Sequence, residues 1–200
     1  MDSKLFFAVT AVIVLMIGYG PYFKDIFRNA TKPHAYTWLI WSITQSTATA
    51  AAFYGGATWG VLGLLAGTIL VVCVFLLSLA YGTKDITRSD TGILLLALSA
   101  IGVWWLTQNP FLSVVMVTAI DGFGYIPTLR KSWLEPWSET LAFWLATAVA
   151  SVLTILSLGE INWLTAPYLI VLATLNTLVF SVCVLRRKSV PKPNRTEVLV

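Results

Sequence analysis

The sequence predicts an all-α integral membrane protein with seven transmembrane helices, and its composition is the first reason. Of the 200 residues, 58% are hydrophobic and only 11% are charged, and the mean hydropathy is +0.81. Soluble domains carry roughly 25% charged residues, and a chain of this size cannot bury so many apolar side chains in its own core. Lipid must cover the remainder, so we expect a multi-pass protein of the cell membrane.

The second reason is a series of apolar runs separated by short polar segments. Crossing a bilayer as a helix takes roughly 17–25 mostly apolar residues, and these runs are too long and uniformly apolar to be barrel strands. The first run also resembles a signal peptide, but cleavage after Gly20 would leave Pro21 first, so we expect it to remain as a span. The predicted spans are Leu5–Tyr19, Ala35–Tyr54, Gly60–Tyr81, Thr91–Thr107, Pro110–Ile126, Thr140–Leu158 and Trp163–Leu185.

The distribution of basic residues supports this count of spans. The chain has 13 Lys and Arg residues and a net charge of +4. With seven spans, Lys4 lies on one side of the membrane and all the others lie on the opposite side. The positive-inside rule then places the N-terminus outside and the C-terminus in the cytoplasm, which explains the charge without nucleic acid as a partner. The residues on the cytoplasmic side are Lys24, Arg28, Lys32, Lys84, Arg88, Arg130, Lys131, Arg186, Arg187, Lys188, Lys192 and Arg195.

Two stretches of the sequence resemble each other. The segments GYGP at 18–21 and GYIP at 124–127 each follow an apolar run, and each has a basic residue three positions after its proline. With a three-residue gap, the alignment continues into the next span and pairs Trp41 with Trp144. The sequence therefore predicts two three-helix repeats.

The predicted fourth helix has a topological purpose. Three spans are an odd number, so a second repeat joined directly to the first would insert upside down, and one additional helix restores its orientation. Parallel repeats related by an axis along the membrane normal are the expected result. The predicted parts are a first repeat at 1–81, a linker with the fourth helix at 82–109, a second repeat at 110–187 and a cytoplasmic tail at 188–200.

This 3+1+3 layout, with an outside N-terminus and proline-ended first and fifth helices, resembles the PQ-loop superfamily, which includes the SWEET sugar carriers. The resemblance covers nearly the whole chain. It departs from the family motif at one point, because Tyr22 and Thr128 stand where the family has glutamine after the proline. The resemblance implies a carrier for a small solute.

Four residues in the repeated segments are candidate hinges. Pro21 and Pro127 lack the N–H group that a continuous helix uses, so a helix bends or ends there. Gly18 and Gly124, one turn earlier, permit bending and close approach of helices. Discontinuities at corresponding repeat positions are typical of transport proteins, although prolines that simply end helices near the interface are the alternative.

Asp121 is the one acidic residue well inside a predicted span. At a rise of 1.5 Å per residue it lies roughly 16 Å from the start of its helix, close to mid-bilayer. A carboxyl group there costs about 2.5–3.5 kcal/mol on insertion scales, and such residues are usually functional. Burial disfavours its charged form, and no predicted span contains Lys or Arg to pair with it. Asp121 is thus a candidate for proton coupling or ligand contact, with a structural hydrogen-bonding role as the alternative.

Other polar and aromatic residues are candidates for a substrate pathway. Asn176 lies near the middle of the seventh span, where it resembles an asparagine that lines the SWEET sugar pocket; Val72 or Cys73 falls where its third-helix partner would be. Gln45 and Thr147 belong to polar stripes on the second and sixth spans, which either line a wet pathway or join helices. Trp41 and Trp144 can stack on a ring-shaped substrate, or belong to the interfacial belt.

The sequence therefore predicts a carrier that moves a small solute, or alternatively a membrane receptor of the same fold that binds without transporting. It contains no combination of residues typical of an enzyme or a metal site, and no intramembrane lysine for a retinal Schiff base. We expect no cofactor. The expected partners are the lipid bilayer, a solute of unknown identity and protons through Asp121, and homo-oligomerisation is left open.

Overall fold

The computed structural model is entirely helical in the residues that it describes, which are 2–29, 31, 33–82 and 88–192. At some helical positions, Pro127 among them, it describes the backbone alone. Lys32, Lys84 and Arg195 of the predicted cytoplasmic charges lie outside the described residues. The elements are α1 (Ser3–Phe27), α2 (Ala35–Tyr54), α3 (Gly60–Tyr81), α4 (Arg88–Thr107), α5 (Pro110–Leu134), the short 3-10 helix η1 (Pro136–Ser138), α6 (Leu141–Leu156) and α7 (Pro167–Arg187).

Four of these helices, α1, α3, α5 and α7, are long and apolar enough to cross a membrane. Helix α6 is apolar but has only 16 residues. Large apolar side chains remain exposed on the outer surface of the bundle, as in Ile17, Ile69 and Ile170, which is expected where lipid is the solvent. These properties are consistent with a membrane protein.

Local sequence signals explain where the helices begin. Asp2 caps α1, since its side chain accepts a hydrogen bond from the Lys4 N–H at 3.0 Å. The Asn109 side chain accepts one from the Phe111 N–H at 3.1 Å at the start of α5. Helices α5 and α7 open on Pro110 and Pro167, where proline's missing N–H removes no intrahelical bond.

The first and fifth helices do not end at their prolines, contrary to the sequence prediction. Helix α1 continues past Pro21 to Phe27, and α5 continues past Pro127 to Leu134. Hydropathy marks the apolar part of a helix but not its end, and a proline removes one hydrogen bond without preventing the following residues from remaining helical. Pro21 and Pro127 are therefore interior prolines about two turns before the ends of their helices.

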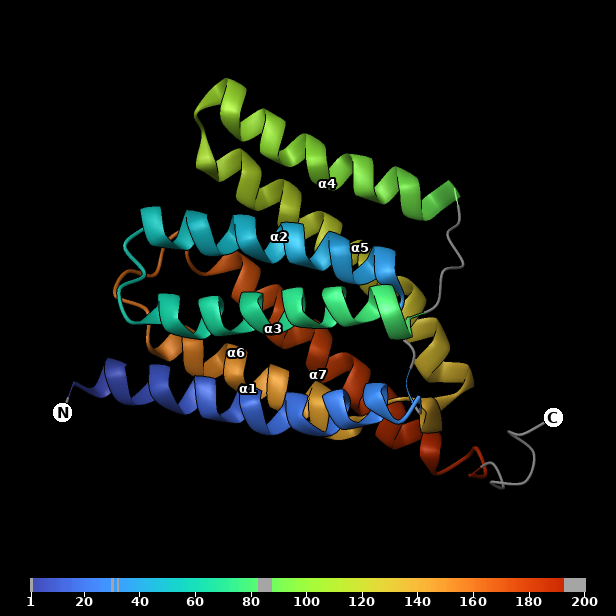
Figure 1. Cartoon of the computed structure of the whole chain (residues 1–200). Coiled ribbons are helices and arrows are strands. Elements are labelled where there is room, and N and C mark those ends of the chain that lie inside the picture. Colours follow the sequence, from blue (N-terminus) through green and yellow to red (C-terminus); the bar gives the residue numbers. More distant parts are fainter. Residues whose placement is uncertain (1, 30, 32, 83–87, 193–200) are drawn as a thin grey trace.

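The helices form one bundle with α4 at its edge (Figure 1). Helix α1 packs on α3 and α6, and α5 packs on α7 and α2. Helices α2 and α3 pack together, as do α6 and α7, while α4 contacts α5 and α2. Helix α1 begins and helix α7 ends at opposite ends of the bundle.

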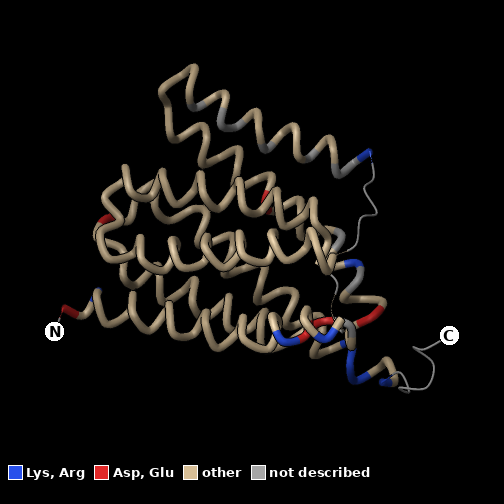
Figure 2. The backbone as a smooth tube through the Cα atoms, viewed as in Figure 1, with Lys and Arg blue, Asp and Glu red and all other residues tan. Residues whose placement is uncertain are grey.

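Charge is concentrated at one end of the bundle. Figure 2 shows Lys and Arg gathered at the end where the C-terminus lies, where α1, α5 and α7 finish and α4 begins. Lys4 is in the first turn of α1, at the opposite end. The interior between the two ends consists of two clusters of buried apolar residues, one around Tyr19, Trp38 and Phe143 and the other around Leu64 and Leu158.

Candidate functional site

A cavity of about 40 Å³ lies inside the bundle, between the two apolar clusters. Its walls come from α1, α2, α3, α5, α6 and α7, and no described residue of α4 lines it. At roughly 10–15 Å³ per water, this space holds about three water molecules. All the substrate-pathway residues that the sequence singled out line the cavity, namely Trp41, Gln45, Asp121, Trp144, Thr147 and Asn176.

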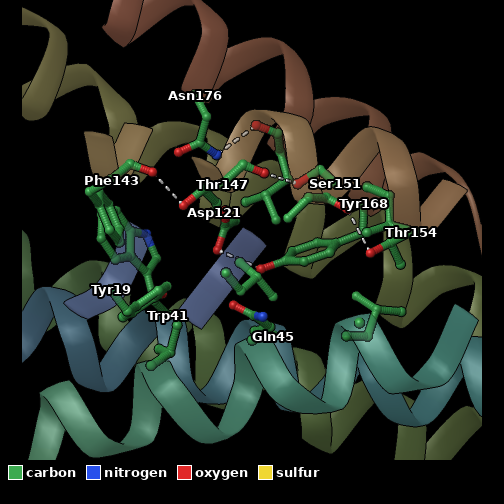
Figure 3. A pocket seen from close by; sticks show the side chains of 18 of the residues that line it. Tyr19, Trp41, Gln45, Asp121, Phe143, Thr147, Ser151, Thr154, Tyr168 and Asn176 are labelled. Carbon is green, nitrogen blue, oxygen red and sulfur yellow. Dashed lines mark hydrogen bonds between the residues drawn. The ribbon is translucent and has the colours of Figure 1, made fainter. Parts of the chain in front are cut away.

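Asp121 is 2% exposed and lies in the cavity wall (Figure 3). The Thr44 hydroxyl donates to its Oδ1 at 2.8 Å, and the Tyr168 hydroxyl donates to the same oxygen at 3.2 Å. Both of these hydrogen bonds use one oxygen, so Oδ2 has the capacity to meet a proton or a ligand. No described Lys, Arg or His lines the cavity, so this carboxyl group has no fixed counter-charge within it.

Asn176 presents an unpaired acceptor at the same cavity. Its side chain is 1% exposed, and its Nδ2 donates to the Tyr125 hydroxyl at 2.9 Å and to the Leu172 carbonyl at 2.7 Å. A carbonyl can only accept, so the nitrogen must face Leu172 and the amide orientation is determined. Asn176 Oδ1 is then buried without a hydrogen-bond partner in the described part of the chain. Because an unpaired buried acceptor is costly, this oxygen marks a place where a ligand or water gains a bond.

Trp41 and Trp144 line the same cavity but differ in their hydrogen bonding. Trp144 Nε1 donates to Glu139 Oε2 at 3.0 Å. Trp41 Nε1 is buried with no acceptor among the described residues. The Trp41 ring packs beside Tyr125, with ring centroids 5.6 Å apart, and Tyr125 in turn packs beside Trp144 at 6.1 Å. These rings give the cavity a largely aromatic wall with one donor left over.

Gln45 and Thr147 provide further polar groups. Figure 3 shows the Gln45 amide directed into the cavity from α2. Gly67 on α3 makes room for it, because a side chain there would meet Gln45 Nε2. The Thr147 hydroxyl donates to the Phe143 carbonyl of its own helix at 2.9 Å, and Ser151 donates likewise to the Thr147 carbonyl at 2.8 Å. These hydroxyls therefore face the cavity mainly as acceptors.

Of the candidate hinge residues, Gly18, Pro21 and Gly124 do not line the cavity. Gly18 lies where α1 crosses α6, and a Cβ atom there would meet the Cβ of Ala146. Gly124 lies where α5 crosses α2, and its added Cβ would stand 3.1 Å from Trp41 Nε1. Pro21 is exposed on α1, and the Pro127 side chain lies outside the described atoms. The two glycines thus allow close helix contact, whereas hinge motion stays a prediction.

Several cavity residues were not singled out by the sequence. Tyr19 and Tyr125 stand one turn after Leu15 and Asp121 on the same helix face, a spacing that could have indicated them. Tyr168 carried no such signal, nor did Thr44, a partner of Asp121 that does not itself line the cavity, because only the packing of α7 and α2 on α5 brings them to Asp121. Val71, and not Val72 or Cys73, lines the cavity from α3, while Cys73 is exposed.

No protein-family model matches this sequence, and comparison with curated proteins and with solved structures finds no match.

Proposed function

We propose that this protein is a multi-pass membrane carrier that moves a small solute by alternating access between two three-helix units. The units are α1–α3 and α5–α7, related as parallel repeats, with α4 as the helix that restores the orientation of the second unit. The observation that carries the proposal is the cavity between the two units, whose walls are mainly apolar but include buried polar side chains, two of which, Trp41 and Asn176, have an atom without a hydrogen-bond partner in the described residues. A solute pathway needs a site of this kind.

The packing of the helices supports a repeat. The contacts of α1 with α3 and α6 correspond to those of α5 with α7 and α2, and the contact of α2 with α3 corresponds to that of α6 with α7. Helices α1 and α5 also have the same length of 25 residues. A pseudo-twofold axis that runs through the cavity accounts for this pattern.

The cavity lining supports the same relation. Each cavity residue of α1 pairs with one of α5, and each of α2 with one of α6, at the same sequence separation. The cavity residues of α3 pair with those of α7 at a sequence separation that is one residue shorter. This spacing needs no three-residue gap, and it pairs Trp41 with Thr147 in place of the Trp41–Trp144 pairing that the sequence suggested. The pairs are Leu15/Asp121, Tyr19/Tyr125, Trp38/Trp144, Trp41/Thr147, Gln45/Ser151, Gly63/Tyr168, Leu64/Leu169, Gly67/Leu172 and Val71/Asn176.

The two units are joined by contacts at the end of the bundle that holds the N-terminus. The Gly159 N–H donates to the Ala57 carbonyl at 3.1 Å, and Asn162 Nδ2 donates to the Gly55 carbonyl at 2.8 Å. Lys4 Nζ donates to the Gly159 carbonyl at 3.1 Å. Alternating access requires these hydrogen bonds, which lie mostly in turns, to break when this end opens, and Leu158 to separate from Gly60, against which it packs.

The proposed topology has the N-terminus outside and the C-terminus in the cytoplasm. The charge at the C-terminal end of the bundle supports it through the positive-inside rule. Single cysteines placed at Asp2 and at Ser189, in a chain without Cys73 and Cys183, test it by labelling intact cells with a membrane-impermeant maleimide. We expect label at position 2 only. Label at both positions would contradict an odd number of spans.

Solute counterflow in proteoliposomes tests the carrier proposal, with solutes first selected by a thermal-shift screen of sugars, amino acids, nucleosides, vitamins and small amines. We expect Gly67→Val to abolish counterflow, because the new side chain occupies the cavity at Gln45. Gly20→Val is the matched control, since no atom lies within 4 Å of a Cβ at Gly20. Saturable binding without counterflow would instead indicate the alternative function, a receptor of the same fold.

A further inference from the structure

We propose that the cavity binds a small organic cation, a primary ammonium compound with one hydrogen-bond acceptor near the ammonium group, whose ammonium pairs with Asp121. Ethanolamine is the simplest compound of this class. Its transport rests on the proposed carrier function, but its binding does not. The assignment follows from the charge, the hydrogen-bonding inventory and the size of the cavity, in that order.

Charge selects a cation. Among the described residues that line the cavity, Asp121 is the sole acidic one and none is basic. An ionised carboxyl group inside an apolar bundle is unfavourable unless a cation pairs with it. A ligand that carries an ammonium group supplies that missing partner, whereas a neutral ligand leaves the carboxyl group unpaired and an anionic ligand is repelled.

The aromatic wall supports the same choice. Tyr19, Trp38, Trp41, Tyr125, Phe143, Trp144 and Tyr168 all line the cavity. The faces of aromatic rings attract cations within about 6 Å, most strongly where water is excluded. A carboxyl group set among such rings is a suitable environment for an ammonium ion. Neutral solutes gain nothing from the electrostatic part of this interaction.

The unpaired polar atoms indicate how the ligand is oriented. Asn176 Oδ1 is an acceptor without a donor, and Asp121 Oδ2 is not used by Thr44 or Tyr168. Together they accept two of the three N–H bonds that a primary ammonium group offers. Trp41, whose side chain lines the cavity, has an indole N–H without an acceptor in the described residues, and a hydroxyl group next to the ammonium is the acceptor that the proposal assigns to it.

Size narrows the class further. A cavity of about 40 Å³ accommodates roughly three waters, and three or four non-hydrogen atoms occupy a similar space. Ethanolamine, with four such atoms, is of this size, whereas a hexose or an aromatic amino acid has about three times as many non-hydrogen atoms. Ethylene glycol and glycolate have nearly the same shape as ethanolamine and differ in charge, so the three compounds separate size from charge.

Ethanolamine and protons then compete for Asp121. The other titratable side chains that line the cavity are Tyr19 on α1, Tyr125 on α5 and Tyr168 on α7, while α2 contributes the hydroxyl of Thr44 to this carboxyl group. A primary alkylamine stays protonated below about pH 8, so acidification changes the site and not the ligand. Protonation of Asp121 removes the negative charge, and ethanolamine affinity is therefore expected to fall as the pH is lowered.

Equilibrium binding of radiolabelled ethanolamine to the full chain in lipid nanodiscs tests the proposal. Wild type is expected to bind ethanolamine saturably and more tightly than ethylene glycol or glycolate. Asp121→Asn is expected to lose about thirtyfold or more in affinity and also the pH dependence. Its amide oxygen still accepts from Thr44 and Tyr168, so its melting temperature should stay near that of wild type. Asp2→Asn, the same substitution at an exposed position outside the cavity, should bind as wild type does.

Three results would overturn the cation assignment: no saturable ethanolamine binding at millimolar concentration, ethylene glycol bound as tightly as ethanolamine, or an Asp121→Asn protein with unchanged affinity. Binding that fails to produce counterflow would contradict the carrier function and leave the cation site standing. Counterflow of a neutral solute that ethanolamine does not inhibit would support the carrier function and contradict the cation site.

Discussion

The α1–α3 and α5–α7 parts of the bundle contribute comparable surfaces to the cavity but different chemistry. Where the first part presents Leu15 and Val71, the second presents Asp121 and Asn176, which are the corresponding residues in the repeat that we propose. The first part supplies an unpaired indole donor at Trp41, and the second supplies acceptors. In the proposed site the ligand therefore has a defined orientation, with its cationic end against α5 and α7 and its acceptor against α2.

The largest expected effect comes from making the two parts alike at the carboxyl position. Asp121→Leu gives α5 the residue that α1 has at Leu15, and it removes the charge that the cation needs. We expect ethanolamine affinity to fall about a hundredfold, measured by binding in nanodiscs. Leu15→Met, which conserves volume in the opposite wall, serves as the control. A change of less than about threefold in Asp121→Leu would show that the carboxyl group has no part in binding.

The two glycines at the helix crossings should differ in stability. In Gly18→Ala the new methyl group meets the Cβ of Ala146, which is held rigidly on α6, so we expect a loss of about 2 kcal/mol in the free energy of unfolding. In Gly124→Ala the neighbour is the Trp41 indole at 3.1 Å, a side chain that can shift. Equal changes in the two variants, measured by detergent-induced unfolding, would contradict this difference.

Asn176→Val tests a second pair of residues, since Val71 corresponds to Asn176 in the proposed repeat. The substitution removes the unpaired acceptor and also the donor to Tyr125 and Leu172. We expect about tenfold weaker ethanolamine binding, the value of one hydrogen bond to a charged group. Val71→Thr, which keeps the shape of the side chain, should change binding little. If both variants bound equally well, the two walls would be equivalent at this position.

The smallest expected effect concerns the tryptophans. Glu139→Gln replaces a charged acceptor of the Trp144 indole by a neutral one, so Trp144 keeps a hydrogen bond and the protein should lose less than about 1 kcal/mol of stability.

Unlike Trp144, Trp41 has no hydrogen-bond partner for its indole N–H in the described residues. Ethanolamine should therefore quench or shift the fluorescence of Trp41 more than that of Trp144, measured in Trp41→Phe and Trp144→Phe proteins. An equal response from both would argue against ligand contact with Trp41.

The sequence indicated the helices well because lipid exposure leaves a strong local signal. Each predicted span overlaps a helix, and α2 and α3 have the predicted bounds, whereas α7 begins at Pro167 and not at Trp163. The ends of α1 and α5 were wrong, since the residues after Pro21 and Pro127 leave the apolar run but remain helical. Hydropathy reports the surroundings of a residue, while the backbone hydrogen bonds decide where a helix ends.

For the site, the sequence by itself determined which residues were unusual. A carboxyl group, an amide and a glutamine inside apolar runs stand out because lipid makes them costly. Only the tertiary structure decided that Asp121, Asn176 and Gln45 share one cavity, that Tyr168 and Thr44 reach Asp121, and that the indole of Trp41 and the amide oxygen of Asn176 remain unpaired. The physical reason is that burial cost is a property of each residue and its neighbours along the chain, whereas hydrogen-bond partners come from helices far apart in sequence, and their pairing depends on how those helices pack.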